Sequence, residues 1–196
     1  WYPRTGVTYS TASVNWYKPQ FIQFNLEVKT TGGLKAVSQG DVKEIAEGQF
    51  RFENKHAQTQ ISLAIGKYQQ KTLKAKDVEF GIWYLEGHDF FTNSFKEIND
   101  TIPNILNERF EDFKRTYKLS YTNEKLSLVE VPAQFKTYPR SFASLQEYVQ
   151  PEQVLIPEKG FMIRAFDFEN QKKNMQRWGN RGDNAMTPLD MELRVF

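Results

Sequence analysis

Residues 99–117, NDTIPNILNERFEDFKRTY, mark the point at which the hydrophobic period of the chain changes. Apolar side chains recur here at helical spacing. Pro103 falls in the first turn, where the missing N–H of proline costs nothing, and Asp100 or Thr101 can cap the start. This stretch therefore predicts a helix. Its apolar positions are Ile102, Ile105, Leu106, Phe110, Phe113 and Tyr117.

Upstream of this helix, apolar residues alternate with polar ones at the period of a half-buried strand. The clearest case is FIQFNLEVKT, residues 21–30, which is followed by the turn signal TTGG. Five such strands, separated by turn residues, predict an antiparallel sheet or sandwich. The other four are LKAV (34–37), GQFRFEN (48–54), ISLAIGKY (61–68) and VEFGIWYLEG (78–87).

Downstream, further strands alternate with irregular segments. KLSLVEV (125–131), QVLI (153–156) and FMIRAF (161–166) are strand candidates, and the polar residues 167–187 are expected to form a long loop. The expected class is α+β. A β-sheet domain would occupy residues 1–95, and a partial α/β portion would occupy residues 96–196.

Both ends of the chain look severed. The first residue is Trp1 rather than Met, and MTPLDMELRVF begins a helix, with Thr187 as N-cap and Pro188 after it, that stops at Phe196. We therefore expect the chain to be a fragment of a longer protein.

Composition excludes several classes of function. The chain has no cysteine, which removes disulfides, thiolate nucleophiles and cysteine zinc sites. No apolar run reaches the length of a membrane span, so we expect no direct membrane contact. Basic and acidic residues number 26 and 24, for a net charge of +2, which does not favour a nucleic-acid partner.

Histidine and serine motifs offer no catalytic centre. The two histidines, His56 and His88, lie far apart in sequence, and a His-Glu-x-x-His motif does not occur. A nucleophile elbow with a central serine does not occur either. We expect no catalytic zinc and no cofactor in this chain. A basic run near Trp178 is expected to be a solvated loop.

The carboxylates of LQEYVQPEQVLIPEKG, residues 145–160, are the remaining candidates. Glu147 and Glu152 lie five positions apart, and such a pair could be a glycosidase-type acid pair, a binding site or a solvated edge. Pro151 favours an edge position, because proline cannot donate to an interior ladder. Glu130 is expected to point outward from its strand, and Glu158 to lie in a turn.

Several segments, taken in order, resemble the aminopeptidase N family of zinc metallopeptidases. The resemblance covers some 130 residues, and it implies the end of a β domain followed by the start of a thermolysin-like catalytic domain. The segments that carry it are WYP at the start, LKAVSQG (34–40), ISLAIGKY (61–68), VEFGIWYLEG (78–87) and FEDFKRTYKLSYTNEKLSLVEVP (110–132).

The resemblance implies a role for one glutamate. The family has a Gly-x-Met-Glu-Asn motif whose glutamate binds the free amino group of the substrate, and Glu152 occupies the matching position. Pro151 and Gln153 stand where the family has Met and Asn, and Glu147 would be a second acid in the same loop. The implied partners are a peptide with a free N-terminus and the rest of the chain's own polypeptide. Zinc is expected only in a full-length parent, whose His-Glu-x-x-His would follow Phe196.

The sequence of residues 150–160 resembles a subgroup of the family more than it resembles the soluble aminopeptidases. In this subgroup, which consists of large bacterial membrane proteins, a peptidase-like module is joined to a transporter-type membrane region. Membership of this subgroup would place the segment outside the cytoplasm, on the periplasmic side, and attach it to the membrane through the full-length parent protein. Two other functions stay open: a stand-alone β-sandwich that binds peptide or carbohydrate, and a small glycosidase that uses Glu147 and Glu152. Stacking residues of the sandwich would be Trp16, Tyr17, Trp83 and Tyr84.

Overall fold

The computed structural model describes residues 21–89, 95–132, 149–158, 168–179 and 186–195. By its internal contacts the chain divides into two compact units. Unit 1 comprises Trp1–Tyr68 and Leu128–Pro157, and unit 2 comprises Gln69–Ser127 and Glu158–Phe196. The units are therefore discontinuous in sequence. The domain boundary predicted near residue 95 stays a prediction.

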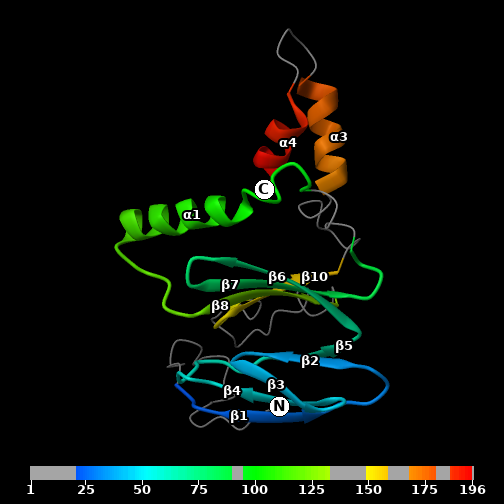
Figure 1. Cartoon of the computed structure of the whole chain (residues 1–196), viewed down its shortest axis with the longest axis vertical. Coiled ribbons are helices and arrows are strands. Elements are labelled where there is room, and N and C mark those ends of the chain that lie inside the picture. Colours follow the sequence, from blue (N-terminus) through cyan, green and yellow to red (C-terminus); the bar gives the residue numbers. More distant parts are fainter. Residues whose placement is uncertain (1–20, 90–94, 133–148, 159–167, 180–185, 196) are drawn as a thin grey trace, which may run out of the picture. The chain divides into compact units, whose positions relative to one another are not determined.

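Unit 1 contains two small antiparallel sheets (Figure 1). In the first, β1 (Asn25–Lys29), β4 (Gln49–Glu53) and β3 (Asp41–Ala46) pair in the order β1-β4-β3. In the second, β2 (Lys35–Ser38) pairs with β5 (Leu63–Gly66). All three strand pairs are antiparallel, as the alternating pattern of residues 21–68 predicted.

The core of these two sheets is aromatic. Phe50 and Phe52 of β4 are 6% and 1% exposed, and Ala36 of β2 is buried with them. Alternate positions of a strand point to the same face, so both phenylalanines lie on one side of β4. Burial of each phenylalanine stabilises the unit by roughly 2 kcal/mol. Leu26, Val28 and Leu63 pack around this cluster.

The second segment of unit 1, Leu128–Pro157, adds further strands, the first of which begins three residues earlier, at Lys125 in unit 2. β8 (Lys125–Val131), β10 (Gln153–Pro157) and β9 (Val149–Gln150) are neighbours in that order, and β9 and β10 form an antiparallel pair. Val129 and Leu155 are buried. The short apolar run QVLI is therefore a strand, as predicted.

Unit 2 begins with a hairpin and a helix. β6 (Tyr68–Ala75) and β7 (Val78–Leu85) are joined by Lys76 and Asp77, and α1 (Ile102–Tyr117) follows. Phe110 of α1 contacts Phe80 of β7 edge-to-face, with ring centroids 5.6 Å apart. Lys76 also pairs with Glu111 of the helix. The predicted helix is confirmed, and Phe110 of the predicted apolar stripe packs on β7, whereas Phe113 and Tyr117 of the same stripe are exposed.

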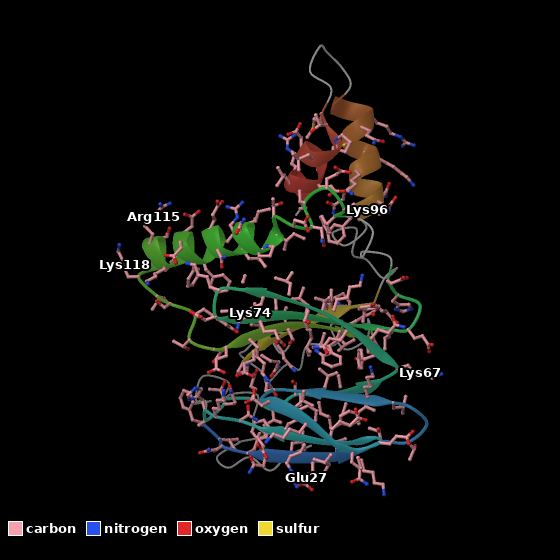
Figure 2. All side chains as sticks on the ribbon, in the orientation of Figure 1. Glu27, Lys67, Lys74, Lys96, Arg115 and Lys118 are labelled. Atoms are coloured by element: carbon pink, nitrogen blue, oxygen red, sulfur yellow. The ribbon has the colours of Figure 1, made fainter. Side chains whose placement is uncertain are left out.

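The ends of α1 follow from local sequence. Pro103 lies in the first turn, and the Thr101 hydroxyl donates to the carbonyl oxygen of Ile98 at 2.8 Å. Lys118 ends the helix in the left-handed conformation, with φ 56°, and its N–H donates to the Lys114 carbonyl at 2.9 Å. Figure 2 shows Arg115 and Lys118 at the outer side of this end of the helix. Cations here complement the helix dipole.

Two further helices complete the described part of unit 2: α3 (Phe168–Gly179) and α4 (Pro188–Val195). The start of α4 is a capping box, because the Thr187 hydroxyl accepts the Asp190 N–H at 3.1 Å and the Asp190 carboxylate accepts the Thr187 N–H at 3.1 Å. This confirms the predicted helix start.

One expectation about this region is wrong. Residues 167–187 were expected to form a loop, and residues 168–179 of that stretch are helical. Most of FENQKKNMQRWG consists of good helix formers, and Phe168, Lys172 and Met175 recur at helical spacing on the less exposed side. The segment is so polar that its few half-buried positions do not form a recognisable apolar pattern in the sequence. The strand predicted at residues 161–166 lies outside the described residues. Helices and antiparallel strands together confirm the α+β class.

Candidate functional site

Glu152 lies at the tip of the hairpin between β9 and β10. Gln150 pairs with Gln153, which leaves Pro151 and Glu152 as a two-residue turn. Glu152 has φ 61°, and proline followed by a residue with positive φ is the pattern of a type II turn. Glycine or asparagine normally occupies this second position, and any other side chain there costs about 1 kcal/mol. A glutamate in this conformation indicates that another interaction holds it.

That interaction is a hydrogen bond from the turn between β2 and β3. The N–H of Gly40 donates to Oε2 of Glu152 at 3.0 Å. Gly40 has φ +88°, and a Cβ at this position would lie 2.6 Å from the carbonyl oxygen of Glu53 and 2.8 Å from Nδ2 of Asn54. Only glycine fits there. The half-buried Glu152 carboxylate is therefore fixed through one oxygen by a backbone donor.

Buried polar side chains hold both turns in place. The Gln39 side chain, 0% exposed, accepts the Ser62 N–H at 2.9 Å and donates to the Gln60 carbonyl oxygen at 3.4 Å. The Ser62 hydroxyl donates to Oε1 of Gln153, which is itself buried. These bonds connect the β2–β3 turn with the first residue of β10. The residue that follows the strained turn is thus anchored independently of Glu152.

Asn54 lies directly after β4 and beside Gly40. It is 6% exposed, and its Nδ2 and Oδ1 atoms form no hydrogen bond with any residue that the structure describes. Buried side-chain amides in folded proteins are nearly always paired. Asn54 was not singled out by sequence reasoning, since NKH after a strand is an ordinary turn signal.

Glu130 differs from its expected position. It was predicted to point outward, but it is 3% exposed. Tyr68 donates its hydroxyl to the Glu130 carbonyl oxygen at 2.6 Å. Burial, together with the Glu130 charge, raises the pKa of Tyr68 to about 12. The apolar neighbours Val129 and Val131 are buried as well, so this end of β8 has no solvated face. Three consecutive buried residues are typical of a strand that is covered on both sides.

The other predicted residues are placed as follows. Glu147, Trp16 and Tyr17 lie outside the described residues. Tyr84 is 5% exposed and belongs to the core, so Trp83 and Tyr84 do not form an exposed stacking pair. The structure consequently gives no geometry for a Glu147–Glu152 pair.

The described ranges contain neither a metal-binding cluster of side chains nor a membrane-spanning helix. Within these ranges no three His, Cys, Asp or Glu side chains are grouped to hold a metal ion. The residues described thus do not fit a catalytic zinc, and the absence of zinc from the whole chain stays a prediction. None of the helices in these ranges is both long and apolar enough to cross a membrane.

A second buried charge lies in unit 2. Oε1 of Glu192 in α4 accepts a bond from Nζ of Lys172 in α3 at 2.8 Å, and Oε2 accepts the N–H groups of Glu97 and Ile98 at 2.7 and 3.2 Å. Burial raises the pKa of the Glu192 carboxyl, but these hydrogen bonds outweigh burial and hold the pKa below its ordinary value. Lys172 also lies 5.8 Å from the centre of the Phe95 ring. This cluster fixes residues 95–98 against both helices.

Comparison with known proteins gives partial similarity to solved structures. No protein-family model and no curated protein matches the sequence. Among solved structures, the crystal structure of Legionella pneumophila aminopeptidase A in complex with aspartic acid is similar to 50% of this chain, with 16% sequence identity and a TM-score of 0.35. The similar part spans 12% of that aminopeptidase. A TM-score of this size does not establish a shared fold, so membership of the aminopeptidase N family stays a prediction.

Proposed function

We propose that this chain is a non-catalytic part of an aminopeptidase-N-like zinc metallopeptidase and that Glu152 anchors the free amino group of a peptide. The observation that carries the proposal is the state of the Glu152 carboxylate. One oxygen accepts the Gly40 N–H at 3.0 Å on a strained turn, while the other has no partner among the described residues. The order of sequence motifs from residue 34 to residue 132 supports the family.

A carboxylate held in this way suits an ammonium group. Charge-assisted hydrogen bonds between ammonium and carboxylate are about twice as strong as neutral ones. The Gly40 N–H fixes the carboxylate before the ligand arrives, so less conformational freedom is lost on binding. Among the described residues, no lysine or arginine forms an ion pair with this carboxylate. The amino group of the ligand would supply a compensating charge.

Zinc has a limited place in this proposal. In a full-length parent it would polarise the scissile carbonyl and activate a water molecule. The described residues of this chain do not form a three-ligand set for it, and the binding of the amino group at Glu152 needs no metal.

A stand-alone β-sandwich that binds peptide or carbohydrate is the second candidate. The two small antiparallel sheets that enclose Phe50 and Phe52 favour it. Such a module would need no amino group on its ligand, which separates the two functions experimentally.

The test is a titration of the whole chain with a short peptide amide, with its amino terminus free or acetylated, followed through the Gly40 amide resonance. We expect the free peptide to shift this resonance and the acetylated one to leave it unchanged. Glu152→Gln should abolish the response. Glu44→Gln is the matched control, because Glu44 also accepts a glycine N–H, that of Gly48 at 3.3 Å. Equal binding of both peptides would refute the anchor and favour the sandwich module.

A further inference from the structure

We propose that the outer edge of β6 (Tyr68–Ala75) binds an extended, acidic peptide segment, which adds to the sheet as one more strand. This surface lies on a different strand from the hairpin that carries Glu152, and it requires no amino terminus on the ligand. The inference therefore goes beyond the proposed function and can fail or succeed separately from it. Residues Gln69–Ala75 of this strand all belong to unit 2.

The first observation is that β6 has a neighbouring strand on one side. It stands at the end of the strand order β6-β7-β8-β10-β9, and among the described strands only β7 pairs with it. Natural edge strands are commonly protected by shortness or by proline, but β6 has 8 residues and contains no proline. An edge of this length can serve as the template for an added strand.

The hairpin formed by β6 and β7 determines which backbone groups lie on this outer edge. The turn between the two strands has two residues, so the strands are antiparallel and Ala75 lies opposite Val78. The N–H of Glu79 donates to the Glu124 carbonyl oxygen at 2.9 Å, so the polar backbone groups of Glu79 face the start of β8 rather than β6.

Three residues of β6 consequently direct their backbone N–H and C=O groups outward: Gln70, Thr72 and Lys74. Backbone direction alternates along a strand, and each of these residues lies opposite a β7 residue that, like Glu79, faces away from β6. An added strand would pair with all three donor–acceptor sets at once.

The charge of this strand selects an acidic partner. Residues 67–76, KYQQKTLKAK, contain four lysines and no acidic residue. Lys76 pairs with Glu111, whereas the exposed Lys71 and Lys74 form no ion pair with any residue that the structure describes. Figure 2 shows Lys74 on this strand. Lys71 and Lys74 lie three positions apart, so each face of β6 carries one of them.

The same lysines argue against a second copy of this chain as the occupant. Two β6 strands that paired edge to edge would bring like charges close together, and such cross-strand pairs are destabilising. An extended segment with a carboxylate on each face would instead form a favourable pair with Lys71 and another with Lys74. Backbone pairing would supply the affinity, and the two lysines would supply the preference for acidic segments.

The test uses the full chain and a short peptide of threonine and valine with glutamate at its second and fifth positions. Its ends are acetylated and amidated, so its binding does not draw on the Glu152 anchor. We expect this acidic peptide to bind and the same peptide with lysine in place of glutamate not to bind. The double variant Lys71→Glu, Lys74→Glu should weaken the acidic peptide roughly tenfold and allow the lysine peptide to bind.

Hydrogen exchange at backbone amides distinguishes strand addition from simple charge attraction. With the acidic peptide, the amides of Gln70, Thr72 and Lys74 should exchange more slowly, whereas those of Lys71 and Leu73, which face β7, should change little. Thr72→Pro removes one outward N–H without altering the pairing with β7, and it should abolish binding. Thr72→Val is the matched control, because it keeps this N–H, and it should bind like the wild type.

Three results would overturn the inference: no binding of the acidic peptide, equal binding of the acidic and lysine peptides, or protection that does not alternate along β6. Equal competition by a single-stranded oligonucleotide would do so as well, because it would indicate a general attraction of polyanions to the lysines. The exchange pattern is measured on the wild-type chain, so it decides the question even if a variant does not fold.

Discussion

Replacement of Glu192 by alanine should destabilise unit 2 by about 3 kcal/mol. The Glu192 and Lys172 side chains are 6% and 18% exposed, so the substitution removes one member of a largely buried ion pair. Removal of one member of a buried pair costs about 3–5 kcal/mol, and the part of Lys172 that reaches water favours the low end of that range. The N–H groups of Glu97 and Ile98 also lose their acceptor, and Ile98 is 0% exposed.

Urea unfolding of the full chain, followed by circular dichroism, measures this loss. The matched control is Asp112→Ala, which breaks the exposed pair with Arg115, where the side chains are 51% and 78% exposed. Exposed pairs contribute little, so the control should stay within about 0.5 kcal/mol of the wild type. Hydrogen exchange at the Ile98 amide gives a local readout and should accelerate only in Glu192→Ala. Equal stability of the two variants would refute the reasoning.

The same cluster predicts a dependence on pH. Because the pKa of the Glu192 carboxyl is lower in the folded state than in the unfolded state, its contribution is present above the unfolded pKa, near about 4.3, and is lost as the pH falls through the folded pKa. The unfolding free energy of the wild-type chain should therefore fall more steeply below about pH 4 than that of Glu192→Ala. Parallel curves for the two proteins would contradict this assignment.

Three further predictions concern single positions. Gly40→Ala should cost about 3 kcal/mol in urea unfolding and Gly87→Ala only about 1, because both have positive φ but only a Cβ at Gly40 meets other atoms within 4 Å. Lys118→Gly should stabilise the protein by about 0.5–1 kcal/mol and raise its thermal unfolding midpoint, because Lys118 has a φ of 56°, which favours glycine. An unchanged midpoint would argue against backbone strain at Lys118. Because the folded pKa of Tyr68 is raised to about 12, its contribution is complete below the unfolded value of about 10 and is lost as pH rises toward 12. Tyr68→Phe should flatten that alkaline loss, and an unaltered alkaline curve would contradict the assignment.

Local patterns in the sequence were sufficient to predict most elements of the fold. The change of period at residues 99–117 identified α1, and Thr187 with Pro188 identified the start of α4, because both signals arise within a few residues. The helix at residues 168–179 was missed, since its stripe of half-buried side chains includes a lysine. Lys172 lies on the less exposed side of α3, where it pairs with Glu192. This glutamate is twenty residues away in the sequence, so a local pattern does not reveal the pair.

The candidate site could be predicted only in part. Glu152 was chosen from the resemblance, and its hydrogen bond to Gly40 joins residues 112 positions apart. No periodicity connects residues at that separation. Gly40 was not singled out, because its need for space arises from Glu53 at the end of β4 and from Asn54 directly after it. Glu130 was expected to be solvated because strand alternation predicts the direction of a side chain but not whether other residues cover it.

The discontinuity of unit 1 has a consequence for the order in which the protein is made. The segment ending at Tyr68 lacks β10 until Pro157 has been synthesised, roughly 90 residues later. At ordinary rates of translation this takes on the order of 10 seconds, far longer than hairpins need to form. During that interval β2, β3, β4 and β5 can pair while Gly40 and Ser62 still lack Glu152 and Gln153. The nascent chain would therefore expose the polar groups of Gly40 and Ser62 to solvent until β10 has been synthesised, and we expect this part of the chain to be more sensitive to proteases during that interval.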